Sequence, residues 1–178
     1  MDDITRKFEI YDVPELLKSA EDNLLKSIDN DYLINAFKRI KQHSANEGQS
    51  ICYIEVSYLY SKIIQKEPPF LMQCMDKKNN IIFAYIIDPF NYLEFWNNFV
   101  FEIKLKARKY LGRISEIRIY ELTMDCIKLI NSIIKSILEK SLKVINKNIT
   151  NELSLLEYIS FGLYNSAQDI IWRKNNIE

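Results

Sequence analysis

The pattern of apolar and polar positions opens with two helical segments. Apolar residues recur at spacings of three and four through residues 14–28, which predicts an amphipathic helix there. Pro14 suits its first turn, because a backbone N–H at that position would have no partner within the helix. Asp29–Asn30–Asp31 interrupts the pattern and can cap a second helix, which ends before Asn46–Glu47–Gly48.

The pattern then changes to the alternation of β-strands. Residues 51–64 are dense in β-branched and aromatic side chains, and one alternating face carries Cys52, Ile54, Val56, Tyr58 and Tyr60. Pro68–Pro69 ends regular pairing after this predicted strand. Five polar residues, 76–80, separate the alternating segment that begins at Phe70 from the apolar run 81–87, which predicts a hairpin. Because 81–87 is apolar on both faces, we expect it to be a central strand.

The rest of the chain is predicted to be largely helical. Asn91 can cap a helix over 91–111 that stops at Gly112. Residues 115–121 alternate and predict a short fourth strand, although the same residues could begin the next helix, over 123–145. A last helix is predicted over 150–174, with Thr150 as its N-cap.

These elements have the order ααβββα(β)αα. Strands joined by short turns pair antiparallel, so we expect a three- or four-stranded antiparallel meander covered by helices, which is an α+β fold. The length of 178 residues suits one domain over 1–178, and 48% apolar with 27% charged residues is typical of a globular chain.

Charge argues against a nucleic-acid partner. Lys and Arg together number 24, as do Asp and Glu, whereas phosphate binding usually requires a basic excess. One local basic run lies between Lys104 and Arg118, and we interpret it as a solvated helix face. No apolar window is long enough for a membrane helix, and the first residues lack the apolar core of a secretion signal, so we expect a cytoplasmic protein with no membrane partner.

Candidate catalytic chemistry is sparse. The three glycines are scattered, which excludes the glycine-rich loops that hold nucleotide or acyl-CoA phosphates. His43 is the only histidine, so a nucleophilic dyad would have to use it as the base, with Cys52 as the nearest thiol in sequence. We interpret Cys52, Cys74 and Cys126 as small buried side chains in a reducing compartment. The acidic residues lack the spacing of a metal site. We therefore predict no catalytic residue, no cofactor and no metal.

Glu55 is the carboxylate whose position needs an explanation, because it lies within an apolar strand. We expect it to point inward and to pair with Lys62 or Arg118. The roles of Glu55 and His43 stay open at this point, and a glycosidase-like pair of carboxylates is not excluded, because such pairs meet only in the folded chain.

One stretch resembles a group of uncharacterised proteins from Firmicutes. The resemblance rests on SICYIEVSYLYSKIIQKEPPFLMQCMDK, FWNNFVFEIKLKARKYLGRI and YELTMDCIK, within residues 50–135. The chain departs from the group's pattern at Tyr60, where a basic residue is expected. The resemblance implies a bacterial cytoplasmic protein and implies no activity.

Two functional hypotheses follow. The first is a protein-binding module, for example an immunity protein that neutralises a toxin, with Tyr53, Tyr58, Tyr60 and Tyr85 forming a surface patch. The alternative is an enzyme whose site is assembled from dispersed carboxylates and arginines. Association of two copies through the long helices stays open under both hypotheses.

Overall fold

The computed structural model describes residues 3–110 and 112–174, and the chain forms two compact units. The first unit contains the described residues up to Ser27 together with Leu93–Ile134, and the second contains Ile28–Tyr92 and the described residues from Lys135 onward. The predicted α+β class is confirmed. The expectation of a single domain stays a prediction.

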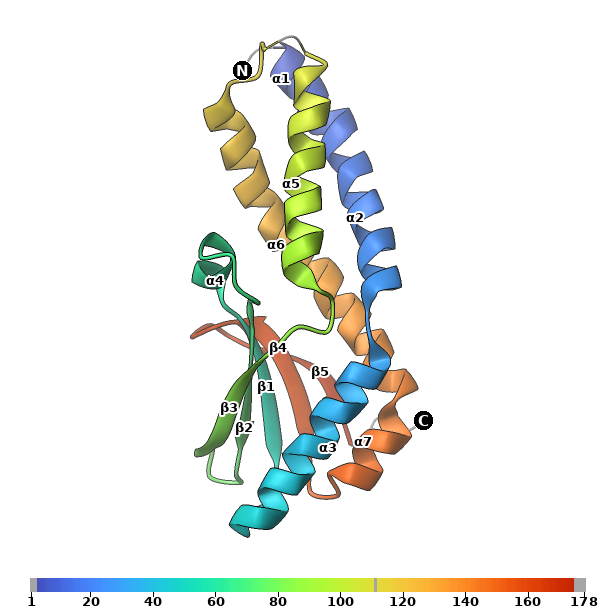
Figure 1. Ribbon diagram of the computed structural model, residues 1–178, viewed down its shortest axis with the longest axis vertical. Coiled ribbons are helices and arrows are strands. Elements are labelled where there is room, and N and C mark those ends of the chain that lie inside the picture. Colours follow the sequence, from blue (N-terminus) through green and yellow to red (C-terminus); the bar gives the residue numbers. More distant parts are fainter. Residues whose placement is uncertain (1–2, 111, 175–178) are drawn as a thin grey trace. The chain divides into compact units, whose positions relative to one another are not determined.

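The first unit is helical. It contains α1 (Asp3–Lys7), the π-helical turn η1 (Phe8–Asp12), α2 (Val13–Ser27), α5 (Tyr92–Arg108) and the first part of α6 (Glu116–Val144). Helices α2, α5 and α6 run side by side (Figure 1). The core of this unit contains Phe8 of η1 and buried apolar side chains that recur at helical spacing on the three helices: Leu16, Ala20, Leu24, Phe99, Ile103, Ile119, Leu122, Ile127 and Ile130.

Of the two interpretations of 115–121, the strand is wrong and the start of the next helix is correct, because Glu116 and the residues after it form the first turns of α6. The Ser115 hydroxyl accepts a hydrogen bond from the Arg118 backbone N–H (3.2 Å), which caps the helix, and Glu116 places a negative charge in its first turn. Ile119 and Leu122 are buried while Tyr120 is exposed. Ile117, which alternates with Ile119 in the sequence, is 72% exposed, so burial follows the helical spacing of Ile119 and Leu122 and not the alternation.

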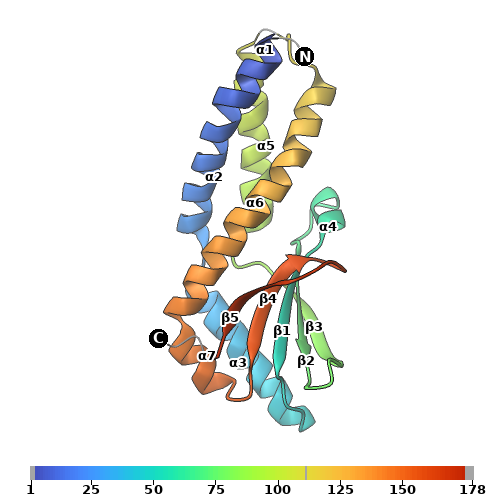
Figure 2. The ribbon, with the colours of Figure 1, turned by 180° about the vertical axis from the view of Figure 1, so that it is seen from behind.

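The second unit is built on a mixed sheet. In the described part of the chain, five strands pair in the order β3-β2-β1-β4-β5 (Figure 2). Their bounds are β1 (Tyr53–Tyr58), β2 (Phe70–Met75), β3 (Ile81–Ile87), β4 (Tyr158–Leu163) and β5 (Asp169–Arg173). Neighbouring strands are antiparallel except β1 and β4, which are parallel. The predicted antiparallel meander is therefore correct only for β1, β2 and β3.

The long helix predicted over 150–174 is also wrong. A short helix, α7 (Asn146–Glu152), is followed by the hairpin β4–β5. Thr150 is not an N-cap but lies inside α7, where its hydroxyl donates to the Asn146 carbonyl (3.1 Å). Ile159 and Phe161 are buried on β4, and Asn165 has a φ of 60° in the turn that follows. The ladder pairing of β4 with β1 and β5 and the left-handed turn residue are incompatible with a continuous helix.

Two further strand predictions need correction. The strand predicted over 51–64 ends at Tyr58, and α4 (Tyr60–Ile64) follows it, so Tyr60 leaves the alternating face. Strand β3 is an edge strand and not the central one, because β1 pairs on its other side with β4. Its apolar residues divide between a face that packs on α3 and a face that is largely exposed.

Helix α3 (Asn30–Glu47) lies on one face of the sheet, which we call the α3 face (Figures 1 and 2). As predicted, the helix begins after Asp29, whose carboxylate accepts from the Tyr32 N–H (2.8 Å). It continues through Asn46 and Glu47, beyond the predicted end, and stops at Gly48, which has a φ of 63°. The sheet side chains on the α3 face alternate along each strand: Ile54, Val56, Tyr58, Phe70, Met72, Cys74, Phe83, Tyr85, Ile87, Ile159 and Phe161. Most of them are buried, and they form the core of the second unit.

No helix among the described residues combines the length and the apolar character that crossing a membrane requires.

Candidate functional site

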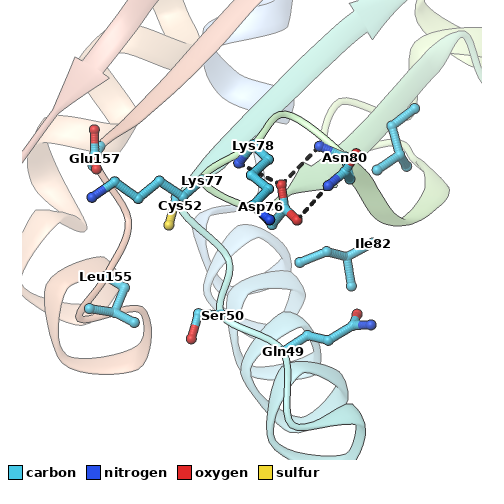
Figure 3. Close-up of a pocket in the computed structure, with 11 residues that line it drawn as sticks. Gln49, Ser50, Cys52, Asp76, Lys77, Lys78, Asn80, Ile82, Leu155 and Glu157 are labelled. Carbon is cyan, nitrogen blue, oxygen red and sulfur yellow. Dashed lines mark hydrogen bonds between the residues drawn. The ribbon is translucent and has the colours of Figure 1, made fainter.

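A pocket of about 700 Å³ lies at the end of the sheet where β1 and β4 begin (Figure 3). The segment before β1, the β2–β3 turn and the segment before β4 meet there. The residues that line the pocket are Gln49, Ser50, Cys52, Asp76, Lys77, Lys78, Asn80, Ile81, Ile82, Leu155 and Glu157. Both ammonium and carboxylate groups are therefore present at its rim.

Asp76 has a structural task in this pocket. Its carboxylate accepts hydrogen bonds from the backbone N–H groups of Lys78 (2.7 Å) and Asn80 (2.9 Å), and from the Asn80 side-chain amide (2.8 Å). The Asn80 side chain is the main reason that the pKa of Asp76 lies below its usual value. A carboxylate held in its ionised form by a turn is poorly suited to donate or take up protons near neutral pH.

Cys52 is not a poised nucleophile. Its side chain is buried, and burial raises the pKa of the thiol, with a further contribution from the negative charge of Glu157. Only the thiolate attacks, so a raised pKa suppresses its reactivity. His43 is absent from the pocket lining, and its ring packs against Phe83 on the α3 face with centroids 4.2 Å apart. The considered Cys–His dyad has no support in this arrangement.

The other two cysteines are also buried and unpaired. Burial raises the pKa of Cys74 to about 12 and that of Cys126 to about 11. Their thiols remain protonated at neutral pH and serve as small apolar groups, which agrees with the interpretation from sequence.

Next to the pocket, two tyrosines stack on the face of the sheet opposite α3. Tyr53 and Tyr158 are register partners in the parallel pair β1–β4, so their rings project on the same side. The ring centroids are 4.7 Å apart with an interplanar angle of 29°, and both rings are half-buried. Stacked rings that remain accessible present a flat aromatic surface together with two phenol groups.

Two carboxylates accompany the stacked rings. Partial desolvation raises the pKa of Tyr53, and the charge of Glu157 raises it further. The pKa of Tyr158 is raised by desolvation first, then by Glu55 and Glu157, while Arg173 has the opposite effect. We call Tyr53, Glu55, Glu157 and Tyr158 the aromatic–acidic cluster. Glu157 also lines the pocket, so the cluster and the pocket adjoin.

The predicted tyrosine patch does not form as expected. Tyr58 is fully buried, and its hydroxyl lies 2.8 Å from that of Tyr92. Tyr85 is on the α3 face, where its hydroxyl donates to the Ala36 carbonyl (3.4 Å). Of the four predicted tyrosines, Tyr53 alone belongs to the cluster. Tyr158 was missed because its segment was assigned to a helix, although the alternation of 158–163 before Asn165 was a usable signal.

Glu55 does not pair as predicted. Lys62 forms its ion pair with Glu67, and Arg118 forms its pairs with Glu9 and Glu121. Glu55 lies opposite Gln73 on β2 and Ser160 on β4, half-exposed on the face opposite α3. Its carboxylate is therefore available beside the stacked rings.

In the first unit, several carboxylates are paired with basic side chains or a phenol group. Arg118 donates to Glu9 (3.0 Å through Nε) and to Glu121 (3.0 Å). Lys106 pairs with Glu15, and the Tyr110 hydroxyl donates to Asp12 (2.5 Å). These contacts occupy part of the predicted basic run and join η1 and α2 to α5 and α6. They explain the charges as fold-supporting pairs.

Across the described residues, no group of three or more His, Cys, Asp or Glu side chains is arranged to hold a metal ion. Comparison with models of known protein families, with curated proteins and with solved structures finds no match to this chain. The properties of the site therefore rest on its own geometry.

Proposed function

We propose that this chain is a protein-binding module whose aromatic–acidic cluster receives a basic side chain of its partner. The observation that carries the proposal is the stacked pair Tyr53–Tyr158 with Glu55 and Glu157 beside it. A Lys or Arg side chain gains from an aromatic face and from a nearby carboxylate together, and the gain is larger where the surroundings are partly desolvated.

The surroundings favour a protein over a small molecule as the ligand. The cluster lies on a sheet face whose exposed or half-exposed apolar residues extend well beyond it: Leu71, Ala84, Ile86 and Ile170. An apolar surface around a small polar and aromatic centre is typical of protein interfaces. Arg173, opposite Tyr158 on β5, lies at the rim and can meet an acidic residue of the same partner.

Within this class we propose toxin neutralisation as the role to test first. No group in the pocket is set up for nucleophilic or acid–base chemistry, so the surface would act by occupying its partner. A toxin that carries a basic recognition surface is the partner that fits the two carboxylates. A toxin gene next to the gene for this chain, and neutralisation of the purified toxin by the purified chain, would support this role.

The proposed attraction between the two carboxylates and a basic side chain can be tested without knowing the partner. We expect an octa-arginine peptide to shift the NMR signals of the Tyr53 and Tyr158 rings, and an octa-glutamate peptide to leave them unchanged. The double variant E55Q/E157Q should bind the basic peptide about fivefold or more weakly, since each lost charge contact is worth up to about 1 kcal/mol. D31N/E47Q is the matched control, because it removes the same charge from α3.

Equal weakening by both double variants would show that net charge alone attracts the peptide, and the proposed cluster would then be wrong. The physiological partner can be identified by placing a photo-crosslinking amino acid at position 53. A captured protein supports the proposal only if the purified protein binds the wild-type chain and loses affinity for E55Q/E157Q.

A further inference from the structure

Strand β3 is an edge strand without the usual protection of an edge. Its residues are Ile81-Ile82-Phe83-Ala84-Tyr85-Ile86-Ile87, with neither a charge nor a proline among them. Natural proteins usually place lysine, proline or a covering segment at such an edge, because its free N–H and C=O groups can pair with another strand. In the described part of the second unit, β2 is the only strand that pairs with β3.

We propose that β3 is a self-association surface, on which a second copy of this chain adds its own β3 antiparallel to the first. The pairing joins two five-stranded sheets into one continuous sheet across a twofold axis. It uses the strand for binding, in the manner of β-strand addition, and does not depend on the aromatic–acidic cluster.

The sequence of the strand fits itself in this orientation. The regular part is Phe83–Ile87, because a β-bulge at Cys74/Met75 disturbs the pairing near Ile82. Paired with itself and centred on Tyr85, this segment sets Ala84 of one copy opposite Ile86 of the other on the face away from α3. The small side chain then accommodates the large one, and Phe83 lies opposite Ile87 on the α3 face. Apolar cross-strand pairs of this kind stabilise a sheet.

The charged turn before the strand favours the antiparallel orientation. This turn carries the exposed residues Lys77 and Lys78, whereas Asp88 after the strand is half-buried and accepts from the Tyr92 N–H (2.8 Å), so it takes no part in the selection. Antiparallel pairing places the lysine-bearing turns of the two copies at opposite ends of the contact. Parallel pairing would set the lysines of the two copies side by side, which costs free energy.

The size of the contact sets the expected affinity. Ile81 is 56% exposed and Ile86 is 41% exposed, so both side chains have apolar area to bury in the contact. A single strand nevertheless buries less than the roughly 1,200–2,000 Å² of a stable complex. We therefore expect a reversible dimer with a Kd on the order of 100 μM, which becomes populated as the concentration rises.

The chain offers a closely matched control for the test. Ile86 on β3 and Ile170 on β5 are both 41% exposed, both lie on the face opposite α3, and each is on one edge of the sheet. We expect I86K to weaken dimerisation about tenfold or more and I170K to leave it unchanged, because only the first places a lysine in the proposed contact. Sedimentation equilibrium measures both, and circular dichroism verifies that each variant is folded.

Amide hydrogen exchange locates the contact independently. We expect amides of β3 to gain protection as the wild-type concentration rises, with no matching change in β5. A wild-type chain that stays monomeric at millimolar concentration overturns the proposal, as does equal weakening by I86K and I170K. A dimer whose added protection lies outside β3, for example in the long helices, overturns it too.

Discussion

At the scale of single residues, the charges beside the pocket divide into those that build the turn and those that remain available. The carboxylate of Asp76 is bound within the β2–β3 turn, where the Asn80 side chain and two backbone N–H groups stabilise its ionised form. Glu157 and Glu55 are outside this turn and lie beside the stacked tyrosines, where Glu157 is also hydrogen-bonded to Tyr53. Hydrogen bonding to the charged form thus explains why Asp76 serves the turn, and the proposed function assigns partner binding to the other two carboxylates.

Replacing Asn80 by Ala should raise the pKa of Asp76 toward its ordinary value of 3.8, because the Asn80 side chain is the largest cause of the lowered pKa. An NMR titration of the Asp76 carboxyl measures this change. The control Lys78→Ala removes a lesser electrostatic contribution and should produce a smaller change.

The effect on stability has a definite sign. The pKa of Asp76 is lower in the folded than in the unfolded chain, so its contribution is present above the unfolded pKa and disappears as the pH falls through the folded pKa. The acid dependence of the free energy of unfolding should accordingly be shallower in N80A. An unchanged Asp76 pKa in N80A would contradict the role given to this turn.

At the scale of elements, the β4–β5 hairpin depends on a close backbone approach. A Cβ added to Gly162 would lie 2.9 Å from the Ala167 carbonyl oxygen and 2.9 Å from the Gln168 side-chain oxygen. Because a backbone atom cannot move aside as a flexible side chain can, only glycine fits at this position. This approach lets the chain reverse after β4 and return as β5.

We therefore expect Gly162→Ala to lower the free energy of unfolding by about 1–3 kcal/mol, the usual cost of overpacking. Urea denaturation measures it. Ser160→Ala, two residues earlier on β4, is the contrasting variant: among the described residues the buried Ser160 hydroxyl oxygen has no hydrogen-bond partner, so its removal should be neutral or stabilising. A G162A variant as stable as S160A would show that the hairpin tolerates the added methyl group.

At the scale of the whole molecule, one helix contributes to both compact units. Helix α6 runs without interruption from Glu116 to Val144, and the division between the units falls within it, after Ile134. Ile127 and Ile130 are buried on one side of this point, and Ile137 and Leu142 on the other. Unfolding of either unit would release part of the same helix, which couples their stabilities.

The two tryptophans provide a test of this coupling, since Trp96 belongs to the first unit and Trp172 to the second. The fluorescence of W172F reports on Trp96, and the fluorescence of W96F reports on Trp172. In each variant, we expect the fluorescence and the far-ultraviolet circular dichroism to change together as the urea concentration rises. Coincident curves are the mark of a single cooperative transition. Fluorescence that changes at a different urea concentration from the dichroism would show two independently unfolding domains.

Local patterns were sufficient for much of this fold. The helices over 14–28 and after Asp29, and the hairpin around 76–80, follow from apolar spacing, caps and turn residues that lie close together in the chain. The sequence also argues against glycine-loop phosphate binding and histidine-dependent catalysis, and this conclusion rests on local facts: scattered glycines and a single histidine. The stacked tyrosines and their neighbouring carboxylates do not follow from local patterns, because Tyr53 and Tyr158 meet only through the parallel pairing of β1 with β4.

What the sequence by itself determined is the α+β class, the helices over 14–28 and after Asp29, and the hairpin around 76–80, because their apolar spacing, caps and turn residues lie close together in the chain. Tertiary structure alone decided that the strand 158–163 pairs parallel with β1, and that β3 is consequently at an edge. The physical reason is that an alternating apolar segment is compatible with more than one partner until long-range hydrogen bonds select one. The contact of Tyr53 with Tyr158 depends on that selection, and so does the candidate site.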